Sequence, residues 1–317
     1  MSKNAIRKAI AILVILFLVY GLAGLYAAHD SVLQAVKNVP WKILPQIIGL
    51  VMLGWLLRAL RWHYYTRVIG WKISLPHNLH AFFAGSALTA TPGKAGELLK
   101  SSLLQTIYPV SITDGAGLLL VERLTDLLAV ILLAVGGFNL LPTGKTYFIL
   151  CCLSIIAGVG LLSCKPLCAL VLNPLTHLKF IGPIALKVEK LLIASRQVLA
   201  PAPLLIGLGI ALVAWSCEAL ALFQLLTACH IAISLTAAGC LFGASTLVGA
   251  LSFLPGGIGS FEAVMLLMLT HLGTPAKLAM PPIILFRVLT LWLACLVGVV
   301  LFFLWPLTQR SHGKQKS

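Results

Sequence analysis

The sequence predicts an all-α polytopic membrane protein. Of its 317 residues, 60% are hydrophobic and only 10% are charged, and the mean hydropathy is +1.04. Soluble domains carry about 25% charged residues, whereas the apolar residues here form long unbroken runs, as membrane-spanning helices require. We expect a single membrane domain over 1–317, with about six full spans and two helix-break-helix hairpins that either re-enter the membrane or form short spans.

The first apolar run covers about 9–28 and follows Lys3, Arg7 and Lys8. At about 20 residues it is long enough to cross a bilayer and longer than the apolar core of a signal peptide. We expect an uncleaved first span with the amino terminus in the cytoplasm, because basic flanking residues favour that side.

The rest of the first half alternates long and short apolar runs. Three long runs predict full spans, at about 43–60, 115–138 and 147–164. Between the first two lie the arms 77–91 and 98–108, and each is shorter than the about 20 residues that a span needs. These arms predict a hairpin that enters and leaves on one side of the membrane.

The stretch 165–200 divides the chain into halves. It is rich in Lys and Arg and contains Asn-Pro and Gly-Pro pairs, so it predicts a cytoplasmic basic linker. Beyond it, 202–228 and 282–305 predict full spans, and 235–254 and 260–272 predict the arms of a second hairpin.

The two halves, 43–138 and 202–305, share an order of features. Each has a helix break before a carboxylate, with Pro92, Gly93 and Gly96 before Glu97, and with Pro255, Gly256, Gly257 and Gly259 before Glu262. Each then carries an intramembrane arginine. Because the first unit starts with a span running inward and the second with a span running outward, we interpret them as inverted repeats. Such repeats are typical of transporters with a site near the bilayer midplane.

Ionisable side chains at membrane depth cost about 2.5–3.5 kcal/mol on insertion scales and are usually functional. Arg123 and Arg287 are candidates to bind a phosphate-bearing headgroup, because a guanidinium binds phosphate through paired hydrogen bonds. The other predicted substrate-binding residues are carboxylates, which could pair with these arginines in the empty site or carry a coupling proton: Glu97, Glu122, Asp126, Glu218 and Glu262.

Structural interpretations stay open beside this one. Glu122 and Asp126 could form local ion pairs with Arg123, and Glu97 and Glu262 could stabilise helix amino termini. Four basic residues are interpreted as anchors that extend to the cytoplasmic face: Arg58, Arg61, Lys94 and Lys100. The cysteines and histidines lack metal-ligand spacing, so we predict no metal and no cofactor, and no aromatic-interleaved basic patch points to nucleic acid.

The motifs Pro92-Gly93-Lys-Ala-Gly96-Glu97, Glu122-Arg123-x-x-Asp126 and Pro255-Gly256-Gly257-x-Gly259-x-x-Glu262 together resemble a flippase-like family signature. That family is named for the transmembrane region of lysylphosphatidylglycerol synthase, the bacterial multiple peptide resistance factor. The resemblance covers about 10–305 and implies a protein that moves a lipid between leaflets or assists this. The full synthase has a soluble acyltransferase-like domain after its membrane part. This chain ends just after its last predicted span, so we expect it not to be an enzyme.

We predict a lipid translocase of the bacterial inner membrane with both termini cytoplasmic. Its substrate would be an anionic phospholipid, a polyprenyl phosphate or a glycolipid, moved by alternating access. The alternative is a non-transporting subunit that supports a lipid-modifying enzyme or glycosyltransferase. A membrane enzyme and an ion channel are weaker alternatives, because no nucleophile set and no ring-forming polar repeat is evident. A homo-oligomer stays open.

Overall fold

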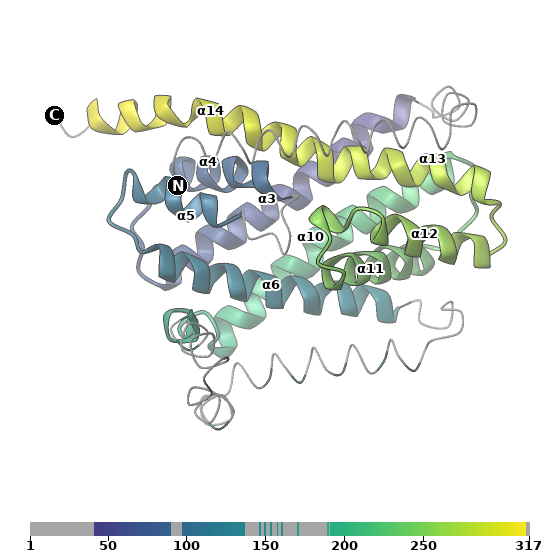
Figure 1. Cartoon of the computed structure of the whole chain (residues 1–317), viewed down its shortest axis with the longest axis horizontal. Helices are drawn as coiled ribbons and strands as arrows, with labels where there is room; N and C mark the ends of the chain where they lie inside the picture. The colour runs from purple at the N-terminus through teal and green to yellow at the C-terminus, as the bar shows by residue number, and fades with distance from the viewer. Residues whose placement is uncertain are drawn as a thin grey trace.

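The computed structural model is helical throughout the residues that it describes, with no strand among them (Figure 1). These residues are 41–89, 97–136 and 191–314, with isolated positions between 146 and 189. The predicted first span, the break residues Pro92, Gly93 and Gly96, and most of the run that includes the fourth span and the linker lie outside them. The all-α class is confirmed for the described part.

Three described helices are long and apolar enough to cross a membrane. They cover Trp41–Val68 and Pro201–Ala228, of 28 residues each, and Ala276–Gln309, of 34 residues. They correspond to three of the predicted full spans. A fourth, over Ile112–Val135, is as long as a span but carries Asp114, Glu122, Arg123 and Asp126.

The first half consists of two long helices with a pair of short ones between them. A 3-10 turn, η1 (Trp41–Ile43), leads into α3, and the order is α3 (Leu44–Val68), α4 (Leu75–Gly85) with the 3-10 turn η2 (Ser86–Leu88), α5 (Leu99–Gln105) and α6 (Ile112–Val135). The Ser111 hydroxyl caps α6 by accepting hydrogen bonds from the Thr113 and Asp114 amides. The outer ends of α4 and α5 lie together, because His77 Nδ1 is 2.6 Å from the Tyr108 hydroxyl.

The second half repeats this order. It contains α10 (Pro201–Ala228), α11 (Leu235–Leu251), the 3-10 turn η5 (Pro255–Gly257), α12 (Ser260–His271), and a long helix formed by α13 (Ala276–Arg287), the π-helical turn η6 (Val288–Trp292) and α14 (Leu293–Lys314). The predicted boundaries for α10, α11 and α12 agree with these to within three residues.

Two predicted spans are too short. The span at 43–60 ends eight residues before Val68, because Arg58 and Arg61 do not leave the membrane helix but pair inside the protein. The predicted span at 282–305 begins later and ends earlier than the helix formed by α13, η6 and α14, which covers 276–314. That helix tolerates Pro281 and Pro282 and continues through its π-helical turn.

The connections after α3 and α10 match residue for residue at an offset of 160. Both are six residues long, over 69–74 and 229–234, and both end in a serine before the next helix. Gly70 has φ of 84° and its counterpart His230 has φ of 60°. The chain therefore adopts the same turn in both halves, and only the second half forms it without glycine, which is uncommon.

The first long helices of the two halves, α3 in one and α10 in the other, cross in close contact. A Cβ atom on Gly54 would lie 2.8 Å from the carbonyl oxygen of Ala214, so glycine is what allows this approach. The amino-terminal part of α3 packs into an apolar core with α10 to α13, and its carboxyl-terminal part packs into a second core with α4, α5, α6 and α14. The crossing therefore joins the two cores.

Substitution of Gly54 tests this crossing. We expect Gly54→Ala to lower the thermal midpoint of the detergent-solubilised protein and Gly54→Val to lower it further, because overpacking costs about 1–3 kcal/mol. The matched control is Gly49→Ala, since a Cβ atom at Gly49 meets nothing within 4 Å. Fluorescence-detected size exclusion after heating measures the midpoint. Equal midpoints for Gly54→Ala and Gly49→Ala would contradict the close crossing.

Candidate functional site

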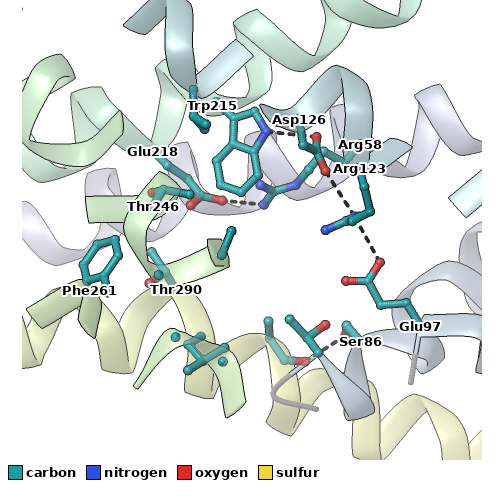
Figure 2. A pocket seen from close by; sticks show the side chains of 18 of the residues that line it. Arg58, Ser86, Glu97, Arg123, Asp126, Trp215, Glu218, Thr246, Phe261 and Thr290 are labelled. Atoms are coloured by element: carbon teal, nitrogen blue, oxygen red, sulfur yellow. Dashed lines mark hydrogen bonds and ion pairs between the residues drawn. The ribbon is translucent and has the colours of Figure 1, made fainter. Parts of the chain in front are cut away.

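A cavity of about 400 Å³ lies between the two halves and is lined by residues from both (Figure 2). From the first half, α3, α4, α5 and α6 contribute; from the second, α10, α11, α12, η5 and the α13–α14 helix. It contains most of the predicted substrate-binding residues, although they are far apart in the sequence.

Charged residues from both halves gather at this cavity. Five cationic side chains line it: Arg58, Arg61, Lys100, Arg123 and Arg287. Of the 8 acidic residues in the sequence, four line it and a fifth binds Arg287 from behind: Glu97, Glu122, Asp126, Glu218 and Glu262. Charges at membrane depth persist when they are paired, and here the two signs balance.

Arg123 is the most exposed cation of the ion pairs at this site, with 27% of its side chain accessible. It lies between two carboxylates, with its Nη2 atom 3.2 Å from Glu97 and 3.1 Å from Asp126, as Figure 2 shows. Its Nε atom is buried and makes no hydrogen bond. This guanidinium therefore lines the cavity between two carboxylates, while its buried Nε donor is unsatisfied.

Behind Arg123 lies a fully buried ionic network. The Lys100 ammonium donates to Glu122, and both residues are only 1% exposed. Arg61 is 0% exposed, and its Nη2 atom lies 2.8 Å from Asp126 and 3.9 Å from Glu122. The Lys100 ammonium also lies 3.9 Å from the centre of the Trp62 ring. Removing one partner of such a pair would leave an uncompensated charge.

Another ion pair lies between the two halves. Arg58 on α3 pairs with Glu218 on α10, and its guanidinium carbon lies 4.4 Å from the centre of the Trp215 ring. The Trp215 indole in turn donates to Asp126 at 2.9 Å, which ties α10 to α6. Trp215 thus contacts charges from two different helices of the first half (Figure 2).

The second hairpin break is held by Arg287. Its Nε atom lies 2.8 Å from Glu262, its Nη2 atom donates to the Gly256 carbonyl at 2.5 Å, and its guanidinium stacks over the Phe261 ring at 4.5 Å. Glu262 also accepts the Gly259 amide at 2.7 Å, so it stabilises the amino terminus of α12. Gly256, Gly257 and Gly259 all have positive φ, which explains the glycine-rich break.

The remaining wall of the cavity is apolar and aromatic. Two tryptophans and six phenylalanines line it: Trp55, Trp215, Phe82, Phe83, Phe242, Phe253, Phe261 and Phe286. Phe253, at the tip of the second hairpin, is 72% exposed and has φ of 54°. The cavity therefore offers charged hydrogen-bonding groups and hydrocarbon surface next to one another.

The structure places Arg123, Arg287, Glu97, Glu122, Asp126 and Glu218 at one cavity, whereas Glu262 lies behind Arg287. The interpretation of Arg58, Arg61 and Lys100 as anchors at the cytoplasmic face is wrong, because Arg61 and Lys100 are buried and all three are ion-paired. For the two arginines, the missed signal was their spacing on α3. Trp55, Arg58 and Arg61 lie at i, i+3 and i+6, on one side of this helix.

Replacement of the Lys100–Glu122 pair tests the buried network. We expect Lys100→Met alone to destabilise the protein by about 3–5 kcal/mol, because Glu122 is left charged and buried. The double variant Lys100→Met with Glu122→Leu should recover most of this loss, since apolar side chains can replace a buried pair. Denaturant unfolding in detergent measures both. A double variant no more stable than the single one would show that Glu122 does not depend on Lys100.

The comparisons with known proteins identify a membrane protein family. The model of the family described as "Lysylphosphatidylglycerol synthase TM region" matches residues 4–298. Two matches are to proteins named "UPF0104 membrane protein" from Methanothermobacter thermautotrophicus, one 26% identical over 96 residues and one 32% identical over 91 residues. These cover 30% and 29% of this chain, and 28% and 27% of the relatives. Because the family model spans most of the sequence, the chain is a multi-pass membrane protein that belongs to the lysylphosphatidylglycerol synthase transmembrane-region family.

Proposed function

We propose that this protein is a lipid translocase that carries an anionic headgroup through the cavity between its two halves. The observation that carries the proposal is the presence of ion-paired and aromatic side chains together in the wall of one cavity. A lipid has the same two parts, and binding both requires both surfaces in one cavity. The family assignment supports a lipid-related role in the membrane.

Arg123 is the proposed headgroup ligand. It is more exposed than Arg287, of whose side chain 9% is accessible, and both of its ion pairs use the same atom, Nη2. A phosphate would compete with Glu97 and Asp126 for this guanidinium, and it can accept two parallel N–H bonds. An anionic phospholipid, a polyprenyl phosphate and a glycolipid phosphate all present this group. Arg287 has a second role, since it also binds the backbone of the break.

The two halves are proposed to be inverted repeats that alternate access to the cavity. Equivalent Glu and Arg residues pair in each half, Glu97 with Arg123 at 3.2 Å and Glu262 with Arg287 at 2.8 Å. Each hairpin has arms shorter than a full span, since α4 with η2 covers 14 residues and α11 covers 17. At 1.5 Å per residue, such arms rise about 20–25 Å, less than a hydrocarbon core of about 30 Å. This favours hairpins that re-enter the membrane.

The proposed location is the inner membrane of a bacterium, with both termini in the cytoplasm. The carboxyl-terminal part of α14 lies against α4 and α5, because Thr308 lies 2.8 Å from His80 and the Trp305 indole donates to Thr106 at 3.2 Å. The segment that follows α3 and carries Lys72 reaches the same region, because the Ser74 amide lies 3.5 Å from the Tyr108 hydroxyl. Basic residues favour the cytoplasmic side. We further propose that the protein moves lipid without chemical change and is not an enzyme.

Reconstitution in liposomes with fluorescent anionic, zwitterionic and polyprenyl-phosphate lipids tests the translocase. We expect faster headgroup exchange between leaflets for a phosphate-bearing class, and a loss of about ten- to hundredfold in Arg123→Ala, because bonds to a charged group contribute about 1.5–3 kcal/mol. The matched control is Arg67→Ala, which removes the same charge from an exposed position in the last turn of α3. It should keep the exchange rate.

Arg123→Lys should recover part of the rate, because it keeps the charge but not the paired donors. Folded protein that accelerates no lipid class would favour the alternative of a non-transporting subunit for a lipid-modifying enzyme. Exchange that is equally fast in Arg123→Ala and in the unmodified protein would remove Arg123 from the proposed headgroup site.

A further inference from the structure

The contacts between the two halves fall into three groups. The α3–α10 crossing joins equivalent positions, because Arg58 and Glu218 differ by 160, as do Gly54 and Ala214. The second group consists of two equivalent contacts that are both formed: α6 packs on α11, and α14 packs on α4 and η2. In the third group, one member of the equivalent pair is extensive and the other is small.

That unequal pair is α6 with α10 and its counterpart, α3 with the α13–α14 helix. Helix α6 packs along α10, whereas α3 meets the long helix chiefly at the η6 turn. The cavity accounts for the difference, because Trp55 on α3 and Thr290 on η6 both line it. Figure 2 shows Trp215 pointing at Asp126 on the closed side.

The correspondence between the two halves identifies the hydrogen bond that is expected when α3 and η6 close on each other. Trp215 corresponds to Trp55 at an offset of 160. Arg123 corresponds to Arg287 at an offset of 164, and the same offset takes Asp126 to Thr290. The equivalent of the Trp215–Asp126 hydrogen bond is therefore a bond from the Trp55 indole to the Thr290 hydroxyl. In the described structure Thr290 donates instead to the Phe286 carbonyl, so its oxygen lone pairs can still accept.

We infer that the protein has a second conformation in which α6 separates from α10 and the η6 region of the long helix closes on α3, with Trp55 donating to Thr290. This inference rests on the proposed inverted repeats. If the two equivalent halves exchange their conformations, the α3–α10 crossing is unchanged, because it joins equivalent positions. This crossing is therefore the pivot. In the second conformation the α6–α10 contact opens and the α3–η6 contact becomes extensive. Each of these contacts closes one side of the cavity when it is formed.

The two closed contacts differ in strength. Trp215 donates to a carboxylate, whereas Trp55 would donate to a neutral hydroxyl, and bonds to charged groups are the stronger class. This difference favours the observed conformation by about tenfold when the cavity is empty. Asp126 also pairs with Arg123 at 3.1 Å. Because Arg123 and Asp126 are both on α6, this ion pair moves with α6 and does not oppose its separation from α10.

Distances between spin labels test the exchange, in full-length protein whose native cysteines are replaced. Four exposed positions serve three pairs: Leu53, Leu132, Val213 and Leu296. The pair 132/213 reports on α6–α10, the equivalent pair 53/296 reports on α3–α14, and 53/213 crosses the pivot. We expect a second population in proteoliposomes in which 132/213 lengthens and 53/296 shortens, while 53/213 does not change.

Three variants test the direction in which the population of the second conformation shifts. Trp215→Phe keeps the ring but removes the bond to Asp126, and should raise the second population by about tenfold. Thr290→Val should lower that population, and Trp55→Phe checks the same bond from its other side. A changing 53/213 distance, or 132/213 and 53/296 that stay fixed in Trp215→Phe, would overturn the inference.

The outcomes separate this inference from the proposed function. Lipid exchange without any change in 132/213 and 53/296 would overturn the two-conformation inference and leave the translocase standing. Reciprocal distance changes without lipid exchange would support the two conformations and count against translocation.

Discussion

The structure depends on the requirement that every charge at membrane depth has a partner. Asp126 shows this best, because it accepts from the Trp215 indole at 2.9 Å and lies 2.8 Å from Arg61 and 3.1 Å from Arg123. These partners come from α3, α6 and α10. In a chain that is 60% hydrophobic, apolar packing alone is compatible with many helix arrangements. The ionic pairs are directional and specific, so they select one arrangement.

The same requirement shapes the cavity. Gathering five carboxylates and five cations in one place leaves the rest of the wall to aromatic and aliphatic side chains. The helix breaks belong to this arrangement, because irregular backbone at membrane depth is tolerated where protein covers it or a cavity adjoins it. Arg287 covers the second break by binding both Glu262 and the Gly256 carbonyl. The same arginine thus takes part in an ion pair and stabilises the break between two helices.

The two halves share a backbone order but differ in chemistry. At the offset of 160 that relates Trp55 to Trp215, Arg61 corresponds to Ala221. At the offsets of 165 and 164 that relate the equivalent glutamates and arginines, Lys100 corresponds to Met265 and Glu122 to Phe286. The buried network of the first half thus has an apolar counterpart in the second, within the core that contains Ala221, Met265 and Phe286. The two halves thus share an order of elements but not a distribution of charge, since most of the charged residues that line the cavity belong to the first half.

The sequence by itself determined the helical class, the second hairpin and most helix boundaries, because hydrophobic runs, prolines and glycines act locally. It also placed the carboxylates that start α5 and α12 and the arginines that bind them, since both lie at similar spacings in each half. Only the tertiary structure decided that Arg58, Arg61 and Lys100 are inside. A basic residue near the end of an apolar run leaves the membrane unless a distant segment supplies a counter-charge. For Arg58 that counter-charge is Glu218, 160 residues away.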